Sequence, residues 1–171
     1  MIYDDLYYKA FDLVDELNAF GLKIAFAESL TGGLISSKLV DVCGASDVLL
    51  GGVVSYTNDI KINILGVKKE TIDTYTEVSE QCAVEMAEGI RRLTGADIAF
   101  SATGYAGDYS DHLDGINDDD NMIGTVWFGF STEDGTEAFC QFFPGQRDAV
   151  RLQAVEFVYD TILSYLRENY E

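Results

Sequence analysis

Hydrophobic residues recur every three to four positions along three long stretches of the chain. This spacing places the apolar side chains on one face, and it predicts amphipathic helices over residues 4–19, 79–93 and 147–166. Ser79 suits the N-cap of the second helix, and Gly21 and Gly95 suit the C-caps of the first and second helices. Shorter periodic segments predict two further helices, at residues 33–42 and 58–65.

Short apolar runs separate these helices and predict strands at residues 23–27, 48–56, 96–103, 122–131 and 136–143. The run 48–56 is apolar at successive positions, so we expect a central strand with both faces covered. Glu133-Asp134-Gly135 indicates a hairpin between the last two strands. The alternation of helices and strands predicts one α/β domain over residues 1–171: a three-layer α/β/α sandwich with a mixed sheet and a C-terminal β-hairpin followed by a long helix.

Composition restricts the possible partners. The chain has 171 residues, 47% of them hydrophobic, which suffices for one domain with a sizeable core. Its 11 Lys and Arg against 30 Asp and Glu give a formal net charge of −19, which repels phosphate backbones and argues against nucleic-acid binding. The first residues lack the pattern of a signal peptide, and no apolar run approaches the length of a membrane span. We therefore expect a soluble, cytoplasmic protein.

Three scattered cysteines, Cys43, Cys82 and Cys140, show no C-x-x-C spacing and cannot all pair. This usage fits a reducing compartment and argues against a disulfide framework or a structural zinc site. We expect all three to be small buried apolar residues.

Three loops follow predicted strands and are expected to meet, because ligands collect beyond the carboxyl ends of strands in open α/β sheets. The first contains Gly32 and Gly33, whose backbone N–H groups can approach a ligand closely at the start of a helix, a position that favours an anion or a developing oxyanion. The alternative is a simple capped helix, with Ser29 or Thr31 as the N-cap. The loops cover residues 28–33, 56–61 and 103–107.

Ser29 is the candidate nucleophile of the first loop, and it needs a base. The single histidine, His112, lies in an aspartate-rich segment, which makes a histidine base improbable. Lys61 follows the second loop and is the leading alternative, provided that burial removes its proton near neutral pH. Asn58 could orient groups beside it by hydrogen bonds. Taken alone, Lys61 is more often a solvated helix lysine.

Arg147 and Arg151 lie one helical turn apart at the start of the last predicted helix. A guanidinium group matches a phosphate or a carboxylate, so either arginine could bind a ligand. The alternative is a salt bridge to one of the many acidic residues. The two interpretations are equal for Arg147, whereas the salt bridge is favoured for Arg151.

Several motifs together resemble the CinA C-terminal domain family, and they occur in that family's order. Ala27-Glu28-Ser29-Leu30-Thr31-Gly32-Gly33-Leu34 resembles its A-E-S-x-T-G-G-x motif. Further matches are Gly52-Val53-Val54-Ser55-Tyr56-Thr57-Asn58 with Lys61, then Ala102-Thr103-Gly104-Tyr105-Ala106-Gly107, and Phe143-Pro144-Gly145-Gln146-Arg147. The resemblance covers almost the whole chain.

The resemblance implies a small α/β/α domain and an activity. Many members are nicotinamide mononucleotide (NMN) deamidases of the PncC type, which release ammonia and nicotinate mononucleotide in pyridine nucleotide salvage. It implies Ser29 as nucleophile and Lys61 as its base, with Tyr56 also at the catalytic centre. It implies a small-molecule nucleotide substrate and a homo-oligomer, and it implies no metal and no cofactor. The substrate-binding residues expected on this basis, including the backbone of an oxyanion hole, are Thr31, Gly32, Gly33, Asn58, Thr103, Gly104 and Arg147.

One segment departs from the family pattern. Residues 108–121 contain six aspartates where the family has a segment rich in Pro, Gly and Ser. Their spacing does not match a calcium loop, so we favour a solvated loop over a cation site. Because such a loop would repel a substrate phosphate, two alternatives stay open: a catalytically diverged nucleotide-binding or regulatory module of the same fold, or an amidase for a less phosphorylated substrate.

Overall fold

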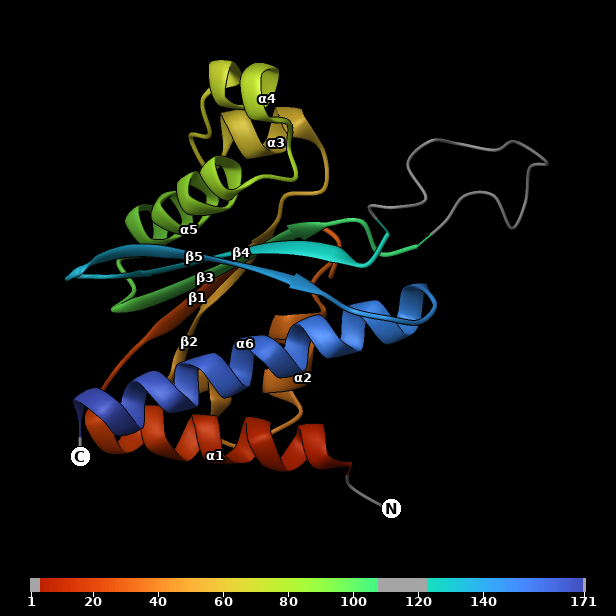
Figure 1. Cartoon of the computed structure of the whole chain (residues 1–171). Helices are drawn as coiled ribbons and strands as arrows, with labels where there is room; N and C mark the ends of the chain where they lie inside the picture. The colour runs from red at the N-terminus through yellow and green to blue at the C-terminus, as the bar shows by residue number, and fades with distance from the viewer. Residues whose placement is uncertain (1–3, 108–122, 171) are drawn as a thin grey trace.

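The computed structural model describes residues 4–107 and 123–170. In these residues a five-stranded sheet has the order β2-β1-β3-β4-β5, in which β2, β1 and β3 are parallel and β4 and β5 complete the sheet as antiparallel neighbours (Figure 1). The mixed sheet with its final hairpin confirms the predicted fold class. The strands are β1 (Ile24–Glu28), β2 (Leu49–Val54), β3 (Ile98–Gly104), β4 (Thr125–Thr132) and β5 (Gly135–Phe142).

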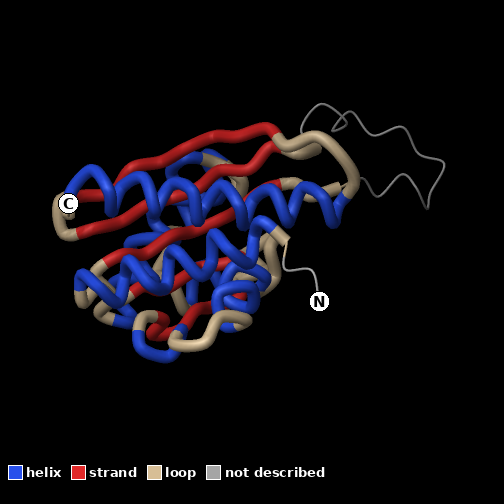
Figure 2. The backbone as a smooth tube through the Cα atoms, turned by 90° about the horizontal axis from the view of Figure 1, so that it is seen from below, coloured by secondary structure: helices blue, strands red, loops and turns tan. Residues whose placement is uncertain are grey.

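Helices cover both faces of the sheet and complete the three layers (Figures 1 and 2). One face packs against α1 (Asp5–Phe20), α2 (Leu34–Val40) and α6 (Arg147–Asn169), and the larger apolar core lies there. The other face carries α3 (Asn58–Asn63), α4 (Lys69–Tyr75) and α5 (Glu80–Thr94), with a smaller core beneath α5. A 3-10 turn, η1 (Ala45–Asp47), precedes β2.

The predicted helix ends are confirmed where a cap defines them. The Ser79 hydroxyl accepts a hydrogen bond from the Cys82 N–H at the start of α5. Gly21 and Gly95 end α1 and α5 in the left-handed conformation, at φ 69° and 72°, which glycine adopts without a Cβ clash.

The predicted central position of the run 48–56 is wrong, because β2 is an edge strand. Its residues alternate between partly buried and exposed, and Leu50 and Val54 are 48% and 51% exposed. An apolar run therefore did not distinguish an edge from a centre; the fully buried strand is β1. Helix α4 was not predicted, since among its residues only Thr71 is buried and no apolar period marks it.

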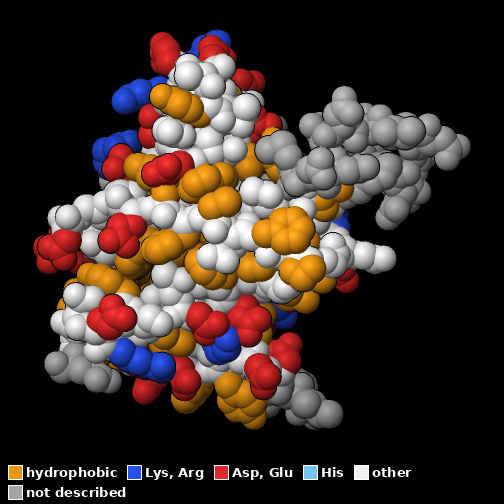
Figure 3. All heavy atoms as spheres, in the orientation of Figure 1, with side chains coloured by type: hydrophobic (Ala, Val, Ile, Leu, Met, Phe, Trp, Pro, Cys, Tyr) orange, Lys and Arg blue, Asp and Glu red, His pale blue; other side chains and the backbone are white. Residues whose placement is uncertain are grey.

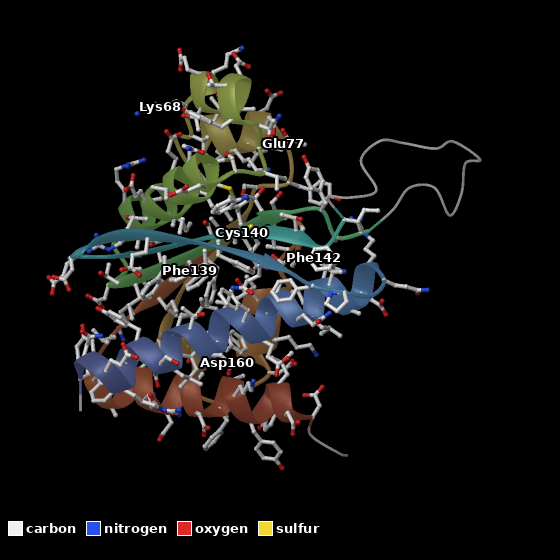
Figure 4. All side chains as sticks on the ribbon, in the orientation of Figure 1. Lys68, Glu77, Phe139, Cys140, Phe142 and Asp160 are labelled. Atoms are coloured by element: carbon white, nitrogen blue, oxygen red, sulfur yellow. The ribbon has the colours of Figure 1, made fainter. Side chains whose placement is uncertain are left out.

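The cysteines are free, and only Cys82 is buried; the predicted burial of Cys43 and Cys140 is wrong. Cys140 lies on the edge strand β5, near the exposed Phe142, where alternate side chains point outward (Figure 4). Acidic side chains are spread over the face shown in Figure 3. Among the described residues, no helix is long and apolar enough to cross a membrane. His112 and the aspartate-rich segment lie outside the described residues.

Candidate active site

The three loops predicted to meet do so, at the carboxyl ends of the parallel strands. They surround a cavity of about 390 Å³ together with the start of α6 and the segment before α5. The parallel pairing of β1 with β2 and β3 brings the ends of these strands to one edge of the sheet. The cavity is lined by Ser29, Leu30, Tyr56, Thr57, Asn58, Lys61, Glu77, Val78, residues 103–107 and Arg147.

Ser29 and Lys61 form a buried pair in this cavity. Lys61 Nζ lies 3.0 Å from Ser29 Oγ and donates hydrogen bonds to the main-chain oxygens of Ser55, at 2.9 Å, and Tyr56, at 3.5 Å. Lys61 is 1% exposed and Ser29 8% exposed. The interpretation of Lys61 as a solvated helix lysine is therefore wrong, because α3 directs its side chain inward to the end of β1.

Burial lowers the pKa of Lys61 below its ordinary value of 10.5, because the charged ammonium loses its hydration. The negative charge of Glu77, and that of a Cys82 thiolate, act in the opposite direction and raise this pKa. Cys82 is itself held neutral, since burial raises the pKa of its thiol to about 11. No carboxylate among the described residues forms a salt bridge with Lys61, and the net result of these influences is a lowered pKa.

The buried carboxylate of Glu28 occupies the start of α2. It accepts hydrogen bonds from the N–H groups of Gly33 at 3.1 Å, Ile35 at 2.9 Å and Ser36 at 2.9 Å, and from the Ser36 hydroxyl at 2.8 Å. The helix start is thus satisfied from within the chain, and neither Ser29 nor Thr31 caps it. Sequence reasoning missed this role, although an acidic residue just ahead of a helix start was its signal.

The glycine turn offers fewer free N–H groups than predicted. The Gly32 N–H donates to the Ser29 carbonyl at 3.0 Å, and the Gly33 N–H is held by Glu28. Within the described residues, the N–H groups of Leu30 and Thr31 have no hydrogen-bond acceptor. Thr31 is fully buried, and its hydroxyl also lacks a partner there.

Arg151 forms no salt bridge with the described acidic residues and does not line the cavity. The salt bridge favoured for it from the sequence is therefore wrong. Its Nε donates to the Leu30 carbonyl at 3.0 Å and its Nη2 to the Thr31 carbonyl at 2.9 Å. The planar guanidinium matches two successive carbonyls, and it clamps the loop that carries Ser29 onto α6. Spacing along one helix could not reveal this partner, because the loop lies 120 residues away in the sequence.

Arg147 lines the cavity, and its side chain is exposed. Its Nη2 donates to the Tyr56 hydroxyl at 3.0 Å. Gly107 packs against the arginine stem, since a Cβ at that glycine would lie 2.8 Å from Arg147 Cβ. The Tyr56 phenol therefore faces Arg147, while Tyr56 reaches Lys61 only through its main-chain oxygen.

Thr103, Gly104 and Asn58 also line the cavity. The Thr103 hydroxyl donates to the main-chain oxygen of Glu77 at 2.7 Å, and this bond ties β3 to the segment before α5. Gly104 allows close contact with β4, since a Cβ there would lie 2.6 Å from the Thr125 oxygen. Asn58 is exposed at the first position of α3. The predicted binding roles of these residues stay predictions.

The layered fold and the buried serine–lysine pair at the carboxyl edge of its sheet define a class of three-layer α/β protein with a polar site at that edge. The chain belongs to the family of the CinA C-terminal domain, whose model matches residues 9–166. The chain spans about a third of the length of the curated relatives it matches first, such as a "Putative competence-damage inducible protein" of Bacillus pumilus, 42% identical over 90% of this chain and 35% of that protein.

A shorter relative matches over nearly its whole length. The "Nicotinamide-nucleotide amidohydrolase PncC" of Enterobacter agglomerans is 42% identical over 90% of each chain. Among solved structures, the CinA superfamily protein KP700603 of Klebsiella pneumoniae has a TM-score of 0.88 at 32% identity and covers 96% of this chain and 99% of that one. The similarity therefore extends to the complete fold.

Proposed function

We propose that the protein is an amidohydrolase that converts the carboxamide of nicotinamide mononucleotide to a carboxylate and releases ammonia. The observation that carries this proposal is the buried pair of Ser29 Oγ and Lys61 Nζ, 3.0 Å apart in the cavity. The name and the similarity of the PncC relative support the same activity.

The hydrogen bonds of Lys61 suit a neutral amine acting as a base. A neutral amine has two N–H bonds and one lone pair. The carbonyls of Ser55 and Tyr56 can take both N–H bonds, which leaves the lone pair for the proton of Ser29. Burial supplies the lowered pKa that this state requires. The lysine then accepts the proton as Ser29 Oγ attacks the carboxamide carbon.

The attack forms a C–O bond and a tetrahedral oxyanion. The unpaired N–H group of Leu30, a residue that lines the cavity, is the candidate donor to this oxyanion, in place of those of Gly32 and Gly33. Lys61 returns its proton to the leaving nitrogen, the C–N bond breaks, and ammonia leaves an ester on Ser29. Water then cleaves the ester, with Lys61 taking its proton and returning it to Ser29 Oγ.

Arg147 is the candidate group for the phosphate of the substrate. Its exposed guanidinium lines the cavity and carries the charge that a phosphate dianion requires. The hydrogen bond to Tyr56 fixes its orientation, so we assign the Tyr56 phenol to substrate binding rather than to proton transfer. Asn58 lines the same cavity and supplies a neutral donor and acceptor.

Ammonia release from NMN by the purified protein tests the proposal. Wild type and Ser37→Ala, which removes an exposed hydroxyl from α2, should release ammonia at equal rates, whereas Ser29→Ala should lose at least about a thousandfold in kcat. Circular dichroism should show all three proteins folded. A wild-type rate equal to that of folded Ser29→Ala would overturn the proposal.

The alternative of a diverged binding module makes an opposite prediction for the same proteins. Calorimetric titration would then show NMN binding to the wild type without any product. A parallel assay with nicotinamide riboside, which lacks the phosphate, distinguishes an amidase for a less phosphorylated substrate. Turnover of NMN that exceeds that of the riboside supports the phosphate role of Arg147.

A further inference from the structure

We propose that Glu77 recognises the positive charge of the pyridinium ring and so selects cationic carboxamides over neutral ones and over the carboxylate product. This inference rests on the proposed function, because it concerns the substrate in the same cavity. It is carried by the position of Glu77 beside Ser29 and Lys61 and by the lack of a partner for its carboxylate.

Glu77 lies in the segment between α4 and α5, above the carboxyl edge of the sheet (Figure 4). It is half-buried and lines the cavity that contains Ser29, Lys61 and Arg147. Of the described residues around this cavity, it is the one that carries a carboxylate. In the described parts of the chain, that carboxylate has no hydrogen bond and no salt bridge, so its charge is available to a ligand.

The backbone next to Glu77 adopts a conformation that a residue with a Cβ disfavours, and hydrogen bonds hold it there. Thr76 has φ 71° and ψ 171°, and it is the one non-glycine residue with a positive φ in the described part of the chain. The Thr103 hydroxyl donates a hydrogen bond to the main-chain oxygen of Glu77 at 2.7 Å, and the Ser79 hydroxyl donates one to the main-chain oxygen of Thr76 at 2.9 Å. A strained turn fixed from two sides is typical of a functional segment, and here it presents Glu77 to the cavity.

The charge of Glu77 opposes the loss of the Lys61 proton. The proposed reaction needs a neutral Lys61, yet a nearby carboxylate stabilises the ammonium form. A bound pyridinium ring would compensate the Glu77 charge and so promote the loss of the Lys61 proton when substrate is present. After hydrolysis the new carboxylate would lie near Glu77 and be repelled, which favours product release.

Binding to the Ser29→Ala protein tests the proposal independently of turnover. The probes are NMN and its reduced form, which has the same shape but an uncharged dihydropyridine ring. We expect NMN to bind at least about tenfold more tightly than the reduced form, and Glu77→Gln in the same background to abolish this preference. Glu80→Gln, on the exposed first turn of α5, is the matched control and should keep it.

The kinetics of Glu77→Gln in the otherwise wild-type protein supply a second readout. Because the Glu77 charge raises the pKa of Lys61, its removal should move the acidic limb of kcat/KM to lower pH. The product should also inhibit this variant more strongly. A folded Glu77→Gln protein with an unchanged ring preference, or with equal losses for both nucleotides, would overturn the inference. If the ring preference holds in binding but wild type releases no ammonia, the proposed function fails and the role of Glu77 stands.

Discussion

Lys61 is an ionisable side chain placed where an ion is poorly tolerated. It is 1% exposed, its nitrogen contacts two main-chain oxygens and one hydroxyl, and burial lowers its pKa. Such a residue is expected to reduce stability in exchange for reactivity. Its effects on catalysis and on folding can therefore be separated by substitution.

Lys61→Met keeps the length of the side chain and removes the charge. We expect ammonia release to be lost while the free energy of unfolding stays equal or increases at neutral pH. Between the lowered pKa of the folded protein and pH 10.5, the unfolded wild type binds more protons at this site than the folded protein, so wild-type stability should rise with pH there relative to Lys61→Met. Each unit by which the folded pKa lies below the unfolded one changes the free energy of unfolding by about 1.4 kcal/mol across this pH range.

Urea titrations of both proteins between neutral pH and pH 10 measure this difference. A stability difference that does not change with pH would show that Lys61 has the same proton affinity in the folded and unfolded chains. That result would remove the basis for its role as a neutral base.

Arg147→Lys and Tyr56→Phe separate substrate binding from proton transfer. Arg147→Lys should raise KM for NMN about tenfold with kcat nearly unchanged, because an ammonium cannot reproduce the two-pronged contact of a guanidinium. Tyr56→Phe removes the hydroxyl that holds Arg147 and should raise KM by a smaller factor. Steady-state kinetics measure both effects. A fall in kcat without a change in KM for Tyr56→Phe would show that the phenol acts in proton transfer rather than in substrate binding.

At the scale of elements, the junction of β1 and α2 determines where Ser29 lies. The Glu28 carboxylate accepts hydrogen bonds from the N–H groups at the start of α2, and Arg151 on α6 donates to the Leu30 and Thr31 carbonyls. The loop between them has little freedom. A change in either support should alter the position of the nucleophile as well as stability.

Glu28→Gln replaces one acceptor oxygen by a donor against the N–H groups of α2. We expect a loss of about 2–3 kcal/mol in the free energy of unfolding, the usual cost of breaking buried hydrogen bonds to a charged group. Glu88→Gln, on the exposed face of α5, is the control and should change stability little. Urea unfolding of both variants measures the effect, and equal stabilities would show that Glu28 does not support the helix.

Elements with strong local signals were predictable, and those defined by tertiary partners were not. The long helices and their caps at Ser79, Gly21 and Gly95 follow from periodicity and local backbone needs. The edge position of β2 depends on which strands pair, and the polar helix α4 has no apolar face to detect. Ser29, Lys61 and Arg147 were predictable because they follow strand ends and match family motifs. Glu77 was not, since its exposure to the cavity depends on the turn at Thr76.

For the whole molecule, the net charge of −19 should oppose the approach of NMN, which carries a net negative charge at neutral pH. Screening by salt weakens this repulsion, because the Debye length falls from about 30 Å at 0.01 M to about 10 Å at 0.1 M. We therefore expect kcat/KM for NMN to rise a few-fold over that range, with kcat nearly constant. Nicotinamide riboside, a net cation, should show the opposite slope. A fall in kcat/KM for NMN would show that the local charge at the cavity outweighs that of the whole molecule.

The homo-oligomer implied by the resemblance stays a prediction.

The central claim is that Ser29, activated by Lys61, forms an ester with the acyl part of the substrate. Hydroxylamine added during turnover of NMN tests it most directly, because this small nucleophile competes with water for an acyl-enzyme whether or not the ester accumulates. We expect wild type to yield the hydroxamate at the expense of the carboxylate while ammonia release does not slow, and we expect Ser29→Ala to yield neither product. Ammonia release with no hydroxamate, or hydroxamate formation by Ser29→Ala, would contradict it.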